Sequence, residues 1–301
     1  MTHGTTTRSV ARRAAPGDRR RLGRRPKPAG SSFLGAVFGG SSFLGAMFSG
    51  SSFLGATFVV FRRQLRLALR NPAWVVIGLL QPILYLTLFG PLLEPLAGQL
   101  GTVNAYTLFV PGLLVQLGLF GALFAGFGLI GEYRDGVIEG ERVTPASRTA
   151  LLLGRVLRDV LQLLVQGIIL VLLSLAFGLD GSVPGMLLGL ALVVLVGAAC
   201  SSSSYALALT TKSEDALAPI LNLVTMPVLL LSGILLPMTL GPTWLQAVSD
   251  VLPTKHIVDA VRAVFRGDFW TAETLWGSLW ALALAVAGLW IGTRTFRRQN
   301  A

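Results

Sequence analysis

The chain has 301 residues, of which 53% are apolar and only 13% are charged, and its mean hydropathy is +0.69. A soluble domain has about a quarter charged residues, so this composition excludes an ordinary soluble enzyme and indicates a membrane protein. The 25 basic residues outnumber the 14 acidic ones, and 13 of the basic residues lie within residues 1–72. In an apolar chain, such an uneven excess of basic residues indicates membrane topology more directly than it indicates a binding partner.

The N-terminal segment, residues 1–57, is basic and of low complexity. Residues 1–30 are rich in Arg, Pro, Gly and Ala and have almost no large apolar side chains, so we expect them to be disordered near anionic lipid head groups. A ten-residue unit that begins with SSFLGA then occurs three times. Ten residues provide no helical unit that can stack, which favours low-complexity expansion over a folded repeat.

Residues 58–71 interleave apolar side chains with arginine, which predicts a basic amphipathic helix at the cytoplasmic membrane interface. The helix should end at Asn71, because the following Pro72 disfavours helical geometry in the residue before it. Nucleic-acid binding is the competing use of such a cluster, but a position next to a membrane span favours the lipid interface. The interfacial arginines are Arg62, Arg63, Arg66 and Arg70.

Residues 58–298 contain six segments that are long and apolar enough to cross a bilayer as helices, since about 20 apolar residues span its core. These segments lie near residues 73–93, 108–130, 159–179, 184–209, 218–238 and 273–293. The sequence therefore predicts an all-α membrane protein with six transmembrane helices. An even number of spans puts both termini on one side. All basic residues except Lys255, Arg262 and Arg266 fall on that side, so we expect both termini to be cytoplasmic.

The last loop, residues 239–272, is too long for a simple turn and too apolar for a solvated one. Its apolar residues recur at helical spacing, which predicts short amphipathic or re-entrant helices at the outer membrane face. A small extracellular cap packed on the bundle fits the same pattern, and the sequence does not separate the two.

The sequence contains no recognisable catalytic or metal site. Binding of ATP through a P-loop needs the motif GxxxxGK[ST], and none of the three lysines has that context. The histidines, His3 and His256, have no cluster of further ligands, so we expect no metal or other cofactor in this chain. The run Ser201–Ser204 favours close helix packing over proteolysis. We predict that the chain is not an enzyme and that a separate chain binds any ATP and Mg²⁺.

Uncharged polar residues are the functional pointers within the spans. They are Gln81, Tyr85, Gln116, Gln162, Gln166 and Asn222. Gln81 and Tyr85 share one helix face, as do Gln162 and Gln166, because residues four apart lie one turn apart. We expect these side chains either to bond between helices or to line a translocation surface. No full charge falls deep in a predicted span, which disfavours a proton relay.

The charged loop after the second span has the most specific pattern. Residues 131–148 read GEYRDGVIEGERVTPASR. This segment resembles the pattern E-R-x-x-G-T-L-E-x-L-x-V-T-P-x-S-R of type-2 ABC exporter permeases, particularly the daunorubicin-resistance-like group. The matching residues are Glu132, Arg134, Gly136, Ile138, Glu139, Val143, Thr144, Pro145, Ser147 and Arg148. The segments 70–72 (RNP), 231–237 (LSGILLP) and 253–262 (PTKHIVDAVR) also resemble that family.

The resemblance implies six helices per subunit, a homodimer or heterodimer of permeases, and two copies of a separate ATPase that binds ATP and Mg²⁺. It also implies that the loop after the second span docks on this ATPase. The docking residues it indicates are Glu132, Arg134, Gly136, Glu139, Thr144, Pro145 and Arg148. Glu141 departs from the family pattern, which usually has an apolar residue there, so we expect it to affect docking to a particular ATPase.

The leading hypothesis is therefore a permease subunit in a bacterial plasma membrane that exports hydrophobic drugs, antibiotics or lipids. Its partners would be the ATPase, a second permease, membrane lipid and an amphipathic substrate, with no nucleic acid. The alternative is a membrane scaffold that recruits cytosolic proteins through the basic N-terminal arm. Deletion of residues 1–57 separates these hypotheses, because export should survive it and scaffolding should not. The substrate itself cannot be read, since apolar cavities select by shape.

Overall fold

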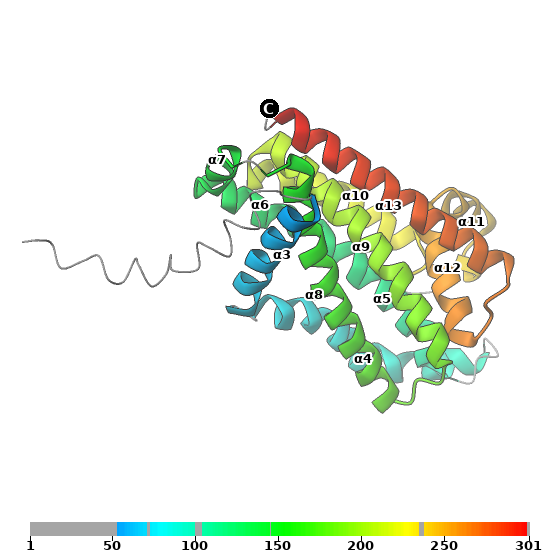
Figure 1. Ribbon diagram of the computed structural model, residues 1–301. Coiled ribbons are helices and arrows are strands. Elements are labelled where there is room, and N and C mark those ends of the chain that lie inside the picture. Colours follow the sequence, from blue (N-terminus) through cyan, green and yellow to red (C-terminus); the bar gives the residue numbers. More distant parts are fainter. Residues whose placement is uncertain (1–52, 71–72, 100–103, 145, 235–237, 300–301) are drawn as a thin grey trace, which may run out of the picture. The chain divides into compact units, whose positions relative to one another are not determined.

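The computed structural model describes residues 53–70, 73–99, 104–144, 146–234 and 238–299, which lie within one unit, Met47–Ala301 (Figure 1). These residues form α-helices and one short 3-10 helix, and no strand occurs among them. Most of the predicted N-terminal arm lies outside the described residues, and with it the basis of the scaffold hypothesis. Asn71, Pro72 and Pro145 also lie outside them.

Six helical segments are long and apolar enough to cross a membrane, which confirms the all-α fold with six spans. The segments are α4 (Ala73–Gln99), α5 with α6 (Ala105–Leu123 and Ala125–Arg134), α8 (Arg148–Ala176), α9 (Val183–Thr211), α10 (Glu214–Leu231) and α13 (Ala272–Gln299). Helix α9 contacts α5, α8 and α13, and α13 crosses the bundle beside α9 in Figure 1. The amphipathic helix α3 (Phe53–Arg70) starts at Phe53 rather than residue 58 and packs on α8.

The third span begins about three turns before the predicted residue 159. The Ser147 hydroxyl caps α8 by accepting a hydrogen bond from the Ala150 N–H at 3.2 Å. Arg155 and Asp159, in the turns that precede and open the predicted span, are only 2% and 9% exposed within the protein. Hydropathy starts the apolar span only at residue 159, because the charges of these turns lower it.

A break divides the second span at Phe124, between α5 and α6. The Ser204 hydroxyl on α9 bridges the break: it donates to the Leu123 carbonyl and accepts from the Gly126 N–H at 3.0 Å. The other three serines of the run bond to carbonyls of their own helix. The serine run thus satisfies backbone groups at a helix junction, in line with the packing role that its sequence favours.

The last loop contains α11 (Thr243–Asp250) and α12 (Pro253–Arg266), and α12 packs against α5, α9 and α13. Its apolar face is fully buried, so α12 is part of the bundle core rather than a helix on its surface. The fifth span, α10, ends at Leu231 instead of residue 238. Just beyond this end, Gly233 adopts a φ of +70°. Buried Arg262 of α12 holds this end by donating to the Gly233 carbonyl at 2.6 Å and to the Leu108 carbonyl at 3.1 Å.

The two ends of the bundle can be told apart by their contacts. At one end, which we call the loop end, Arg134 at the end of α6 pairs with Glu214 at the start of α10. The Arg297 Nε near the end of α13 also donates to the Thr149 hydroxyl at the start of α8, at 3.3 Å. At the opposite end the Thr107 hydroxyl of α5 donates to the Asp180 carbonyl beyond α8 at 3.1 Å.

We predict that Gly112→Ala destabilises the fold, because a Cβ at Gly112 would lie 2.1 Å from the Ile234 carbonyl oxygen. Overpacking of this kind costs roughly 1–3 kcal/mol, which should lower the midpoint of thermal unfolding in detergent. Gly121→Ala on the same helix is the matched control, since its Cβ would meet no atom within 4 Å. Equal midpoints for the two variants would contradict the close approach of α5 to the end of α10.

Candidate functional site

The loop between the second and third spans forms a short helix, α7 (Val137–Arg142), that follows directly on α6. Gly136 makes the turn between them with a φ of +71°, a conformation that glycine adopts without steric cost. The side chain of Ile138 in α7 is buried, which fixes the helix against the bundle. The loop is therefore a folded element with a defined inner and outer face.

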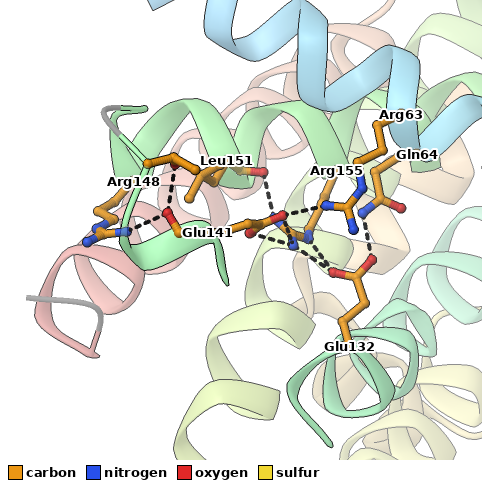
Figure 2. Close-up of polar contacts among 8 residues, drawn as sticks. Arg63, Gln64, Glu132, Glu141, Arg148, Leu151 and Arg155 are labelled. Carbon is orange, nitrogen blue, oxygen red and sulfur yellow. Dashed lines mark hydrogen bonds and ion pairs between the residues drawn. The ribbon is translucent and has the colours of Figure 1, made fainter. Parts of the chain in front are cut away.

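A cluster of polar side chains, buried at Arg155 and exposed at Arg63, connects the loop helix α7 to α3, α6 and α8 (Figure 2). We call it the Arg155 cluster, and its members are Arg63 and Gln64 of α3, Glu132 of α6, Glu141 of α7 and Arg155 of α8. Three consecutive helices, α6, α7 and α8, thus meet at the Arg155 guanidinium group, and α3, which precedes them in sequence, binds the two carboxylates.

Arg155 lies at the centre of the cluster, with a side chain that is 3% exposed. Its Nη2 lies 2.6 Å from Glu132 Oε2 and 2.8 Å from Glu141 Oε2, and its Nε donates to Glu132 at 3.1 Å. Its Nη1 donates to the Leu151 carbonyl one turn earlier at 3.2 Å. All three guanidinium nitrogens are therefore engaged, which is the condition under which a buried arginine is tolerated.

The carboxylates of the cluster also bind the interfacial helix. Arg63 Nη1 donates to Glu141 Oε1 at 2.9 Å, and the Gln64 amide donates to Glu132 Oε1 at 2.6 Å. Figure 2 shows Arg63 and Gln64 reaching from α3 toward these two carboxylates. Two arginines balance two glutamates, so the cluster is neutral as a unit. The loop, α3 and the third span are consequently linked through charge-assisted hydrogen bonds.

The structure gives Glu141 an internal role that the sequence did not reveal. Its position is usually apolar in the pattern that the loop resembles, and here its residue is 9% exposed and faces Arg155. A buried glutamate at this position is tolerated because Arg155 and Arg63 approach the carboxylate from two sides. The pairing of Glu141 with Arg63 spans 78 positions, so no local pattern could have indicated it.

The predicted docking residues separate into an inner and an outer group. Glu132 belongs to the Arg155 cluster, and Arg148 Nη1 donates to the Glu141 carbonyl at 3.4 Å. Arg134, Gly136, Glu139 and Thr144 are exposed, as is Val143, whose exposed fraction of 87% is high for a large apolar residue. Pro145 lies outside the described residues.

The predicted translocation residues do not form one surface. Gln162 and Gln166 line a common cavity, and Gln166 also donates to the Val75 carbonyl of α4 at 3.2 Å. Gln81 and Tyr85 face one another on α4, 3.5 Å apart, whereas Asn222 is exposed on α10. Gln116 is 2% exposed, and its amide has no hydrogen-bond partner among the described residues.

A second buried polar group lies one turn beyond Arg155. Arg158 Nη1 pairs with Asp159 Oδ1 at 2.6 Å, and the Tyr205 hydroxyl of α9 donates to the other oxygen of Asp159. This pairing was not predicted from the sequence, because hydropathy places Asp159 at the edge of the third span and its partner Tyr205 is 46 positions away. A cap signal at Ser147, followed by a helical pattern through Arg155, could have found it.

The interfacial arginines have different environments. All four are exposed on α3, and Arg63, whose side chain is 45% exposed, also pairs with Glu141 of the Arg155 cluster. The same helix exposes large apolar side chains, including Leu54 and Leu69. This combination of basic and apolar exposed residues is typical of a helix that lies at a lipid interface.

Comparisons with known proteins add a family to this geometry. Residues 55–265, which include the whole Arg155 cluster, match the ABC-2 type transporter family. The ycf38 protein of Porphyra purpurea, named as a transport permease, is 29% identical over 205 residues, or 67% of this chain and 70% of the relative. The daunorubicin resistance ABC transporter permease protein DrrB1 of Streptomyces coeruleorubidus is 26% identical over 234 residues, or 76% and 82%. The Escherichia coli K12 inner membrane transport permease YhhJ is 26% identical over 220 residues, or 68% and 55%.

We predict that Arg155→Ala strongly destabilises the chain, because it leaves Glu132 and Glu141 buried without their shared partner. Breaking a buried ion pair from one side costs about 3–5 kcal/mol. Arg134→Ala removes an exposed pair with Glu214 and should cost at most about 1 kcal/mol. Thermal unfolding of both variants in detergent makes the comparison, and a loss for Arg155→Ala no greater than for Arg134→Ala would refute the assigned role.

Proposed function

The chain belongs to the ABC-2 type transporter family, and on this premise we propose that it is the permease subunit of an exporter driven by a separate ATPase. A transport permease role and a multi-pass membrane location follow from family membership. The proposal adds that the cargo is a hydrophobic drug, an antibiotic or a lipid, and that the loop end with both termini faces the cytoplasm of a bacterium. ATP and Mg²⁺ would bind to the ATPase.

The observation that carries the proposal is the continuity of the Arg155 cluster from the α6–α7 loop into α3 and α8. A permease without its own nucleotide site needs an element that receives motion from outside and transmits it to the spans. The loop is bound on its inner face to α3 and α8, and its outer face is exposed. A displacement of α7 would therefore move α8 with it, since separating them requires breaking the buried Arg155–Glu141 pair, and it would act on α3 through the more exposed Arg63–Glu141 pair.

The proposed docking surface is the outer face of the α6–α7 loop. Glu139 offers a carboxylate there, and Val143 offers an apolar side chain beside Thr144. Arg134 lies at the edge of this face, where it pairs with Glu214 at 2.9 Å. Glu132 and Arg148 would act from the inner side by holding the loop in shape, and Gly136 by allowing its turn. We assign Pro145 to the same surface from sequence alone.

The proposed assembly contains two permeases and two ATPases. Helices α4 and α10 expose long apolar stretches, and α10 presents Leu223, Val224, Met226 and Leu230 together with Asn222. Helix association in membranes uses close packing together with hydrogen bonds from polar side chains such as Asn. The second permease is a copy of this chain or a related one.

We predict that Glu139→Lys combined with Val143→Asp weakens copurification with the ATPase, because the pair reverses one charge and removes one apolar contact on the docking surface. The measurement is the yield of ATPase recovered with tagged permease after coexpression with the ATPase encoded beside it. Asp215→Lys is the matched control, since Asp215 is an exposed carboxylate at the same end of the bundle but outside the loop. If the unmodified chain recovers none of the candidate ATPases of its own organism, the proposed function is wrong.

A second variant pair tests transmission separately from docking. Arg63→Ala removes only the bond from α3 to Glu141, so the ATPase should still copurify while export falls several-fold. Arg62→Ala on the neighbouring, exposed arginine should leave export unchanged, because Arg62 makes no polar contact to another described residue. Transport of a fluorescent amphipathic drug by inverted vesicles provides the readout. Equal export by both variants would remove the Arg63–Glu141 pair from the transmission path.

A further inference from the structure

A cavity of about 380 Å³ lies among α5, α6, α8 and the start of α10. Glu214 of α10 forms part of its wall near the loop end, and Gln166 lies farthest from that end on α8. The cavity is distinct from the Arg155 cluster and from the docking surface. Its walls differ in chemistry, which indicates what kind of molecule it can hold.

The wall formed by α5 and α6 is made of small and aromatic residues. Gly121, Ala125 and Gly128 follow one another at spacings of four and three, so they share one side of the span. A Cβ added to Gly121 or Gly128 would meet no atom within 4 Å, so this side opens onto free space. Beside it the rings of Phe124 and Phe127 stack with their centroids 5.8 Å apart. Such a wall suits an apolar body.

The opposite wall is polar and belongs to α8. Arg158, Gln162 and Gln166 lie four residues apart and face the cavity together. Arg158 uses only Nη1 in its pair with Asp159, and its buried Nε has no hydrogen-bond partner among the described residues. Gln162 makes no hydrogen bond to another described residue either. Arg158 and Gln162 thus have donors that no described residue accepts, whereas the Gln166 amide is already used on the Val75 carbonyl.

The acidic groups of the cavity are already paired. Both oxygens of Asp159 accept hydrogen bonds, one from Arg158 and one from the Tyr205 hydroxyl. Glu214 is paired with Arg134 at 2.9 Å. The two arginines balance the two carboxylates, so no net negative charge repels an incoming anion. The hydrogen-bonding capacity that remains unused in the cavity is mainly that of donors, so a ligand group that accepts hydrogen bonds fits it.

We propose that this cavity binds the anionic head group of an amphipathic molecule, a phosphate or a carboxylate, with Arg158 and Gln162 as donors. Phosphate and carboxylate oxygens match the planar guanidinium group and form charge-assisted hydrogen bonds with it. The apolar body of the ligand lies against Phe124 and Phe127, over the glycine face. This inference rests on the proposed function, because the permease role decides what happens to the ligand. The ligand is either exported or retained as a bilayer lipid.

The test measures binding to the full chain, purified in detergent, by native mass spectrometry. The probes share one tail and differ in the head group: dodecyl phosphate is the anion, and dodecanol is the neutral analogue. We expect dodecyl phosphate to bind at least about tenfold more tightly than dodecanol. Equal binding of the two probes would overturn the assignment of an anion site.

Two variants locate the site. Gly128→Leu fills the cavity without touching Arg158 and should reduce binding of dodecyl phosphate at least about tenfold. Gly131→Leu is its matched control, because Gly131 is on the same helix, has equally open space and does not line the cavity. Arg158→Gln removes the charged donor and should give the same loss, and Gly128→Leu keeps the test decisive if that variant fails to fold. Unchanged binding by Gly128→Leu would refute the site.

Two further measurements distinguish a bilayer lipid from a transported molecule as the source of the head group. They also distinguish failure of the anion site from failure of the permease role. If a bilayer lipid fills the cavity, a phospholipid remains bound to the extracted wild type and is lost from Gly128→Leu. If a transported amphipath fills it, no phospholipid is retained, and vesicles with the ATPase export dodecyl phosphate. Export that is unaffected by Gly128→Leu, together with unchanged binding, would overturn the cavity and leave the permease role standing. Anion binding by a chain with which no ATPase copurifies would overturn the permease role and leave the anion site in the cavity standing.

Discussion

The loop end of this protein depends on one buried guanidinium group. Arg155 reaches a Glu from α6 and a Glu from α7 with the same nitrogen, and both carboxylates in turn accept from α3. Removing charges from water is expensive, and the expense is offset only while every partner stays in place. The four helices are therefore constrained to each other more strictly than apolar packing alone would require, since apolar surfaces can slide and still remain buried. Such a constraint is what the proposed transmission of motion from the α6–α7 loop to the spans would require.

The opposite end uses a related device with a different acceptor. Arg262 of α12 bonds to the Gly233 carbonyl at the end of α10, where backbone acceptors have no partner within the helix. Burial lowers the pKa of Arg262 to about 10, and Asp259 nearby opposes that shift, so the group stays charged at neutral pH. Burial in turn raises the pKa of Asp259. Each end of the bundle thus has an arginine that fixes a helix terminus, with carboxylates as the acceptors at the loop end and carbonyls at the other.

The sequence predicted what depends on composition along the chain and missed what depends on pairs. Six spans followed from hydropathy, because each needs only its own run of apolar residues. Gln162 and Gln166 were placed correctly on one face of a helix, since spacing alone decides that. Glu141 was expected only to affect docking to a particular ATPase and Asp159 was placed at the start of a span, because two of their partners, Arg63 and Tyr205, are 78 and 46 positions away. A charge within a span is costly without its partner, and a single sequence does not show which residue that partner is.

Helix α8 brings these features together. Within fewer than four turns it presents Arg155 to the α6–α7 loop, Arg158 and Gln162 to the cavity, and Gln166 to the backbone of α4. A helix is stiff along its axis, so in the proposed mechanism a shift imposed on Arg155 by the loop also moves Arg158 and Gln162, the donors of the proposed head-group site. Under the two proposals, binding at the docking surface and binding in the cavity would be coupled to the extent that two positions of α8 differ in their contacts with each ligand.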